Sequence, residues 1–204
     1  NGDDAKRYLT IEPQTFLLFP YEFSDQQNLL STSALKSRFP LAWKYLNKFQ
    51  DILEARDGGD LKGDEWYRFS RNQSLDKVGF SKLYIAGTAP EVRCSIDLAG
   101  DFFLTGGRVD GVIPADQKEL FFLLGILNST PCNFVFKRIA RIKVNNFFEA
   151  NKQFIAPLPI PNSTENQKQS VGSKATSLQK FCNDRRDLAN RIAKRSSSVK
   201  VKKQ

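Results

Sequence analysis

The feature that most limits the fold of this chain is the run from Leu120 to Leu127, in which every residue is apolar or glycine. Asp116 and Glu119 have the spacing of a helix-capping pair, and the segment 128–131, Asn-Ser-Thr-Pro, predicts a stop. A helix that is apolar on all sides leaves no face for water, so it must be buried. We therefore expect residues 117–128 to form a buried helix of the core.

Short strands separated by glycines are expected before this helix. Runs rich in aromatic and β-branched residues, bounded by glycine or proline, favour strands. The predicted strands are residues 7–11, 15–19, 66–69, 82–86, 92–96 and 109–113.

Three further helical stretches are predicted. Leu41, Tyr45, Phe49 and Leu53 recur every four positions after Pro40, which indicates an amphipathic helix of about four turns. A second stretch runs from residue 132 to about 142 and mixes apolar with basic residues. The third has apolar residues close to heptad spacing, so it needs a partner, either the body of the chain or another chain. These residues are Val171, Ala175, Leu178, Cys182, Ala189 and Ile192.

The pattern as a whole predicts an α+β fold, with a curved mixed β-sheet, helices packed around it and a C-terminal amphipathic helix. The segment 157–161, Pro-Leu-Pro-Ile-Pro, cannot continue a helix or a central strand and closes a body of residues 1–161. Residues 162–169 read as a polar linker, 170–195 as a helical arm and 196–204 as a disordered basic tail.

Composition excludes several classes of protein. No apolar run approaches the roughly 18 residues of a membrane span, and the polar N-terminus does not resemble a signal peptide. The chain has no Met, so we expect a piece of a longer or processed protein. Cys94, Cys132 and Cys182 are too far apart for a zinc knuckle or a disulfide framework. Isolated reduced thiols fit a cytoplasmic protein.

The sequence offers no catalytic constellation. There is no His, which removes the commonest general base and metal ligand. The glycines near residue 106 lack the Lys and Ser or Thr of a phosphate loop. The segment 145–148, Asn-Asn-Phe-Phe, lacks the prolines of an amino-methyltransferase motif, and pairing Asp97 or Asp101 with a distant Glu is too loose for a nuclease site. We expect no catalytic residue, no metal site and no cofactor in this chain.

Charge is unevenly distributed along the chain. Residues 166–204 carry eleven Lys and Arg against two acidic residues, whereas residues 1–165 carry twenty of each. A basic surface suits a polyanion such as DNA. The alternative for the tail is a solvated helix with a frayed end.

Two basic clusters are interleaved with aromatic residues. Arg68 and Arg71 lie on the predicted strand 66–69 and its exit, where alternation would let Arg68 point outward while aromatic side chains pack. Arg can form two parallel hydrogen bonds with the edge of a guanine or with a phosphate. Including the second cluster, 137–143, the candidate DNA-binding residues are Arg68, Arg71, Lys77, Lys82, Arg93, Arg108, Lys137, Arg138, Arg141 and Lys143. The alternative is ordinary surface charge beside core aromatics.

Six landmarks occur in the order found in one known family. The chain resembles the TaqI-like C-terminal specificity domain, the target-recognition domain of type II and type IIG adenine-specific DNA methyltransferases and restriction-methylation fusions. The landmarks are Pro-Tyr after the strand 16–19, Leu-x-x-Arg ending at Arg56, Trp-Tyr-x-x-x-Arg at 66–71, the Lys-apolar strand at 82–85, Leu-Gly-x-Leu-Asn-Ser at 124–129 and Leu-Pro-Ile-Pro at 158–161. They span residues 8–161. The sequence departs at Asn72-Gln73, where the family often has Pro, and 137–146 fits less well.

The resemblance implies a division of labour. This chain would recognise double-stranded DNA without catalysis, and the differing places would carry its target preference. An upstream methyltransferase part of the parent, with or without a nuclease part, would bind S-adenosylmethionine, use Mg²⁺ for cleavage and flip an adenine. The helix 117–128 would be scaffold, with Asn128 and Ser129 capping and turning the chain.

Three other functions are alternatives to this one. The chain could be half of a type I restriction specificity subunit, in which its last helix packs on a second helix. It could be a protein-interaction module that docks a partner on residues 170–195. An independent enzyme ranks last, since the catalytic groups are missing.

Overall fold

The computed structural model describes residues 5–10, 12, 15–22, 28–71, 74–103 and 109–201. The chain divides into two compact units. One comprises residues 1–13 and 80–204, and the other residues 14–79. The division cuts across the predicted body, 1–161.

The α+β class is confirmed by the described residues. The helices are α1 (Thr32–Arg38), α2 (Pro40–Asn47), α3 (Gln50–Glu54), α4 (Leu120–Leu127), α5 (Thr130–Ile139), α6 (Lys152–Ile155) and α7 (Glu165–Val201). Short 3₁₀ turns are η2 (Arg56–Gly59), η3 (Leu75–Lys77), η4 (Gln117–Glu119) and η5 (Val144–Asn146). The strands are β1 (Lys82–Ala86), β2 (Thr88–Ala89), β3 (Cys94–Asp97), β4 (Val109–Val112) and β5 (Phe148–Glu149). They form two small antiparallel sheets rather than one curved mixed sheet.

The larger sheet has the order β3-β1-β4, with β1 in the centre. All five residues of β1 are buried, so both faces of the sheet are covered. Leu83 and Ile85 face the main core, whereas Tyr84 and Ala86 belong to a second cluster with Val109. Because side chains alternate along a strand, a continuous apolar run fits a strand buried on both faces.

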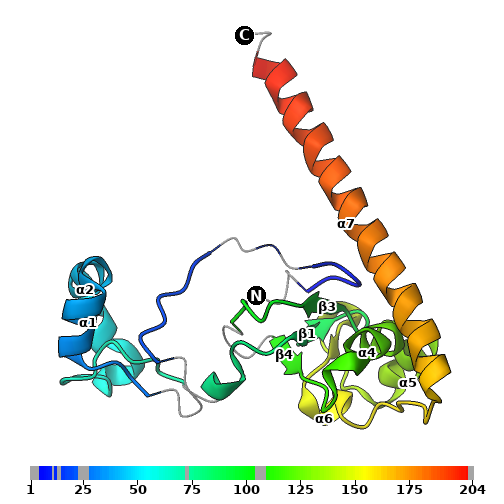
Figure 1. Ribbon diagram of the computed structural model, residues 1–204, viewed down its shortest axis with the longest axis horizontal. Coiled ribbons are helices and arrows are strands. Elements are labelled where there is room, and N and C mark those ends of the chain that lie inside the picture. Colours follow the sequence, from blue (N-terminus) through cyan, green and yellow to red (C-terminus); the bar gives the residue numbers. More distant parts are fainter. Residues whose placement is uncertain are drawn as a thin grey trace. The chain divides into compact units, whose positions relative to one another are not determined.

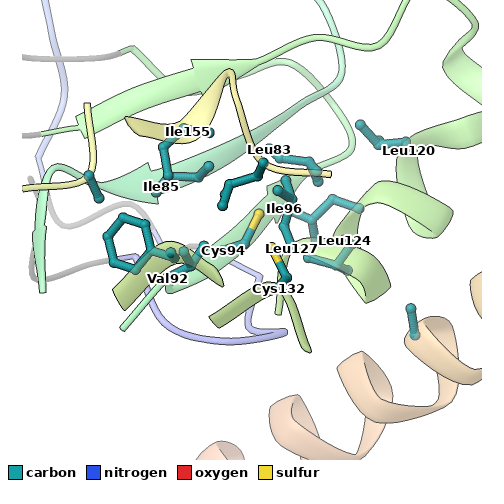
Figure 2. Packing of buried hydrophobic residues seen from close by; sticks show 14 of the residues in the cluster. Leu83, Ile85, Val92, Cys94, Ile96, Leu120, Leu124, Leu127, Cys132 and Ile155 are labelled. Carbon is teal, nitrogen blue, oxygen red and sulfur yellow. The ribbon is translucent and has the colours of Figure 1, made fainter. Parts of the chain in front are cut away.

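Helix α4 is buried as predicted, because it lies between the sheet and α7 (Figure 1). Leu124 and Leu127 pack against sheet residues such as Ile96 (Figure 2). On the other side, a Cβ added at Gly125 would lie 2.8 Å from Cγ1 of Val171. Glycine therefore sets how closely α4 and α7 approach. Within the described residues no single helix could span a membrane by length and hydropathy, although the bent pair 117–127 and 130–139 passes that test together.

Helix α7 is longer than the sequence indicated. It begins at Glu165, inside the predicted linker, and its backbone is helical to Val201, inside the predicted disordered tail. Its first half is held to the body, where Ala175 enters the core and Gln179 donates to Thr10 Oγ1 at 2.9 Å. Arg186 forms an ion pair with Glu12 at 2.8 Å. These contacts hold the part of the helix that was predicted, and the ion pair of Lys168 with Glu119 at 2.5 Å holds its added first turn to the body.

The second unit is a helical cluster around aromatic rings. Pro40 begins α2, as predicted, but the expected four-turn helix is broken at Lys48 and Phe49 into α2 and α3. The prediction that Leu41 and Tyr45 lie on the buried face of this helix is wrong, because their side chains are 82% and 54% exposed. The partly buried residues that pack on the cluster are Leu29, Ala34, Trp43, Leu46 and Leu53.

Two strands predicted near the N-terminus do not form. Tyr8 has a left-handed backbone with φ 61°, and Thr10 contributes an isolated parallel bridge to Ile96. Residues 16–20 have no regular structure, and Phe16 is 95% exposed. Their apolar character favoured strands, but the hydrogen bonds that these segments make are single contacts, such as Tyr8 N–H to the Cys94 carbonyl and Leu30 N–H to the Pro20 carbonyl, and not a continuous ladder.

Candidate nucleic-acid interface

The predicted DNA-contacting residues lie in both units. Arg68, Arg71 and Lys77 belong to residues 14–79. Arg108 lies outside the described residues. The unit that contains residues 80–204 holds Lys82, Arg93, Lys137, Arg138, Arg141 and Lys143.

Lys82 is a correction, because its side chain is buried. Its Nζ lies 3.2 Å from Oδ2 of Asp97, and the two side chains are only 4% and 1% exposed. The ammonium also donates to the carbonyl of Phe80 at 3.0 Å. A buried, paired ammonium cannot reach a phosphate or a base edge, so Lys82 stabilises the fold instead.

Asp97 organises the turn that follows β3. Its carboxylate accepts the backbone N–H groups of Gly100 at 2.8 Å, Asp101 at 3.2 Å and Phe102 at 3.1 Å. The hydroxyl of Tyr84 donates to Oδ2 at 3.4 Å, and burial together with the Asp97 charge raises the pKa of Tyr84 well above its usual value. The carboxylate is therefore occupied within the chain.

Arg68 does not lie on a strand, which is a second correction. Residues 64–67 form turns, and Trp66 and Tyr67 are both buried, so the expected alternation of faces is absent. Arg68 Nη2 donates to the carbonyl of Asp60 at 3.3 Å, and Nη1 lies 3.9 Å from Glu65. The Trp-Tyr landmark builds the aromatic cluster: Trp66 packs on Trp43 with ring centroids 5.7 Å apart.

Arg56 holds that turn in place. Its guanidinium donates at 2.8–2.9 Å to the carbonyls of Leu53, Trp66 and Arg68. Planar, fixed donors make Arg suited to bracing several carbonyls at once. Sequence reasoning noted Arg56 only as part of a landmark, and its role depends on a loop ten residues away.

Three other candidate cations, Arg71, Lys77 and Arg93, are at least partly exposed. Arg71 is exposed, whereas Arg93 is half-buried. Lys77 is exposed and forms an ion pair with the adjacent Asp76 at 2.7 Å.

The second cluster, Lys137, Arg138, Arg141 and Lys143, is exposed throughout and is called the basic segment below. Lys137 and Arg138 lie in the last turn of α5. Arg138 stacks on the ring of Phe134, with its Cζ 3.3 Å from the ring centroid. Among the described residues, only Lys143 of this segment pairs with a carboxylate, that of Glu149 at 3.0 Å. Unpaired cations within a few residues of one another can meet consecutive phosphates.

The last two residues of the basic segment, Arg141 and Lys143, lie on the first strand of a hairpin formed by residues 141–149. Its strands are joined by Glu149 N–H donating to the Arg141 carbonyl at 2.9 Å and by Lys143 N–H donating to the Phe147 carbonyl at 2.7 Å. Phe148 pairs with Ala89 in the small sheet, and its ring lies 5.9 Å from that of Phe136. The base of the hairpin is therefore anchored in the core.

The tip of this hairpin is the 3₁₀ turn η5. Val144 is 81% exposed, and Asn145 and Asn146 are exposed with left-handed φ of 60° and 57°. Asn adopts this conformation more readily than most residues. The sequence analysis compared 145–148 with a catalytic motif and included 137–146 among the places that would carry target preference, but it did not predict this turn, for which the Asn-Asn pair was the available signal.

Asn128 and Ser129 cap and turn the chain, as predicted. The Asn128 side chain is fully buried; its Oδ1 accepts from Cys94 N at 3.0 Å, and its Nδ2 donates to Cys94 O at 2.9 Å. The carboxamide thus pairs with both backbone polar groups of Cys94 at the edge of β3. Ser129 caps α5 by accepting from Cys132 N, and Asn133 Oδ1 accepts from the next part of that edge, Val92 N, at 2.7 Å.

In comparison with known proteins, no family model matches the chain. It is 23% identical over 197 residues, 90% of its length, to the type II restriction enzyme and methyltransferase RM.Eco57I of Escherichia coli. It is 27% identical over 109 residues, 52% of its length, to the type II methyltransferase M.MjaIV of Methanocaldococcus jannaschii. The chain spans 20% and 36% of these relatives. This weak similarity supports an association with restriction-modification methyltransferases.

Proposed function

We propose that this chain is the DNA target-recognition part of a type II restriction-modification methyltransferase, similar to the TaqI-like specificity domains. The observation that carries the proposal is the exposed basic segment at the end of α5, followed by an anchored hairpin. Both relatives have names of restriction-modification enzymes, and the match to the first covers 90% of this chain but a fifth of that protein. A part of that size suits recognition rather than the whole reaction.

The buried polar groups support a role without catalysis. Asp97, Asn128 and Asn133 are each engaged by main-chain or Lys partners within the described residues. They leave no polar cradle at these positions for a methyl donor. We propose that S-adenosylmethionine and Mg²⁺ bind other parts of the parent protein, and that this chain contacts DNA.

Binding of the full chain to duplex DNA across a salt series tests the proposal. Each phosphate contact contributes about 0.9 to the slope of log K against log salt. Changing Lys137, Arg138 and Arg141 together to Gln should weaken binding on all sequences and lower the slope by about 3. The charge-matched control changes the exposed α7 residues Lys174, Lys180 and Arg191 to Gln. No binding at low salt, or equal losses in both triple variants, would contradict the proposed interface.

One observation favours a second function, the docking of a partner helix on α7. Leu178, Phe181, Leu188 and Ile192 are 44–63% exposed at spacings close to a heptad pattern. Removing residues 188–204 distinguishes the two functions. DNA binding that survives the truncation belongs to the body, whereas loss of a defined oligomer would support docking through α7.

A further inference from the structure

We propose that the hairpin 141–149 enters the major groove and that Val144, Asn145 and Asn146 at its tip read base edges, with a preference for A·T pairs. This inference rests on the proposed function and assigns the reading of sequence to residues outside the predicted DNA-binding set. The basic segment then binds phosphates, while the tip supplies specificity.

The dimensions of the hairpin fit the groove. The major groove of B-DNA is about 12 Å wide and admits a two-stranded β-ribbon. Paired strands lie about 5 Å apart, which leaves room for side chains on both sides. Three cross-strand contacts hold the ribbon: the two backbone hydrogen bonds that form the Ile142–Phe148 bridge, and the Lys143–Glu149 ion pair.

Anchoring makes the tip a rigid reader. Ala150, directly after the hairpin, is fully buried and its N–H donates to the Gly87 carbonyl at 2.9 Å. Phe148 pairs with β2 and packs on Phe136. Side chains held on such a frame lose little further freedom when they bind, so their hydrogen bonds contribute to discrimination.

The chemistry of the tip points to adenine and thymine. An Asn carboxamide can donate to N7 and accept from N6 of adenine at the same time, because adenine presents this acceptor and this donor side by side. Neither tip Asn has a side-chain hydrogen bond within the part of the chain that the structure describes. Val144 is 81% exposed, and an apolar side chain of this size suits the thymine methyl group.

Cations lie beside the tip rather than at it. Arg141 begins the hairpin and Lys137 and Arg138 precede it at the end of α5. From Lys137 to Lys143 the backbone spans roughly 15 Å, given helical and extended rises per residue, which is enough to follow a few phosphates. Contacts of this kind position a protein on the duplex without reading its sequence.

The test is selection of bound duplexes from a library with a randomised central segment, using the full chain and matched variants. Asn145→Gly with Asn146→Gly removes both carboxamides and keeps the left-handed turn, because Gly adopts positive φ freely. Asn162→Gly, at an exposed position outside the hairpin, is the control. We expect the wild-type chain to select A·T pairs, and the double variant to lose roughly 5- to 150-fold in preference at those positions with an unchanged salt slope.

The outcomes separate the two proposals. If the wild type selects a sequence and the double variant selects it equally well, the tip is not the reader, while the proposed function stands. Binding of the wild type without any sequence preference also overturns the reading role. If the wild type binds no duplex even at low salt, the proposed function itself fails.

Discussion

Removing the side-chain amide of Asn128 should destabilise the unit that contains the sheet. The side chain is fully buried and makes three hydrogen bonds: from Cys94 N at 3.0 Å, to Cys94 O at 2.9 Å and to Leu124 O at 3.1 Å. Cys94 O also accepts from Tyr8 N, so it retains a partner in Asn128→Ala. Cys94 N loses the partner that the side chain provides, and a buried unsatisfied N–H costs about 1–3 kcal/mol. With the lost bonds and the small cavity, we expect a decrease of about 3 kcal/mol in the free energy of unfolding.

The two tryptophans make this effect measurable by unit. Trp43 and Trp66 both lie in residues 14–79, so their fluorescence follows the unfolding of that unit, whereas α7 dominates the far-ultraviolet circular dichroism. In urea, Asn128→Ala should shift the dichroism transition and leave the fluorescence transition nearly unchanged. Asn162→Ala, at an exposed position, should shift neither.

Asn128→Asp separates hydrogen bonding from packing. It keeps the volume and the acceptor but places an oxygen against the Cys94 carbonyl, so it should destabilise at least as much as Asn128→Ala. A loss below about 1 kcal/mol in both variants would refute the reasoning, because a buried hydrogen-bonding group cannot be removed so cheaply. If either variant lost DNA affinity while still fully folded, Asn128 would have a role in binding rather than in the scaffold.

Three further changes test other contacts. Gly125→Ala should destabilise by about 1–2 kcal/mol because its Cβ would lie 2.8 Å from α7, whereas Gly172→Ala, whose Cβ meets ordinary contacts at 3.6 Å or more, should be neutral or stabilising; in urea unfolding only Gly125→Ala should lower the free energy of unfolding. Lys82→Met leaves the Asp97 charge buried and should cost about 3–5 kcal/mol, yet the salt slope of DNA binding should not change; a lower slope would return Lys82 to the interface. An alkylating reagent should modify Cys182 in the native chain and spare the other two cysteines, because both are buried and burial raises their thiol pKa, for Cys132 to about 11; rapid reaction of all three, read by mass spectrometry, would contradict this.

The candidate interface was only partly predictable. The basic segment was found from sequence because consecutive Lys and Arg at the end of a helix have few ways to be buried. Lys82 and Arg68 could not be placed correctly. Whether a cation reaches solvent depends on which strand or turn packs over it, and Asp97, the partner of Lys82, is fifteen residues away in sequence.

The family landmarks have a structural role where the structure describes them. Arg56 braces a turn, Tyr67 donates to the Leu30 carbonyl at 2.7 Å, and Tyr21 accepts from Phe69 N at 2.8 Å. The Leu-Gly-x-Leu-Asn-Ser element supplies the close approach at Gly125 and the strand-edge partner Asn128. Recognition of the pattern from sequence was therefore recognition of a scaffold, and the proposed reading tip, residues 144–146, lies between two of its landmarks.

The sequence by itself determined the α+β class, the buried α4 and its ends, β1, and the presence of a C-terminal helix, although not the full length of that helix. These depend on local periodicity, caps and apolar runs, which act over a few residues. Only the tertiary structure decided that α2 and α3 present a different face, that residues 16–20 have no regular structure and that α7 covers α4. Such outcomes are set by which distant surfaces exclude water together, and that free energy belongs to pairs of segments rather than to either segment alone.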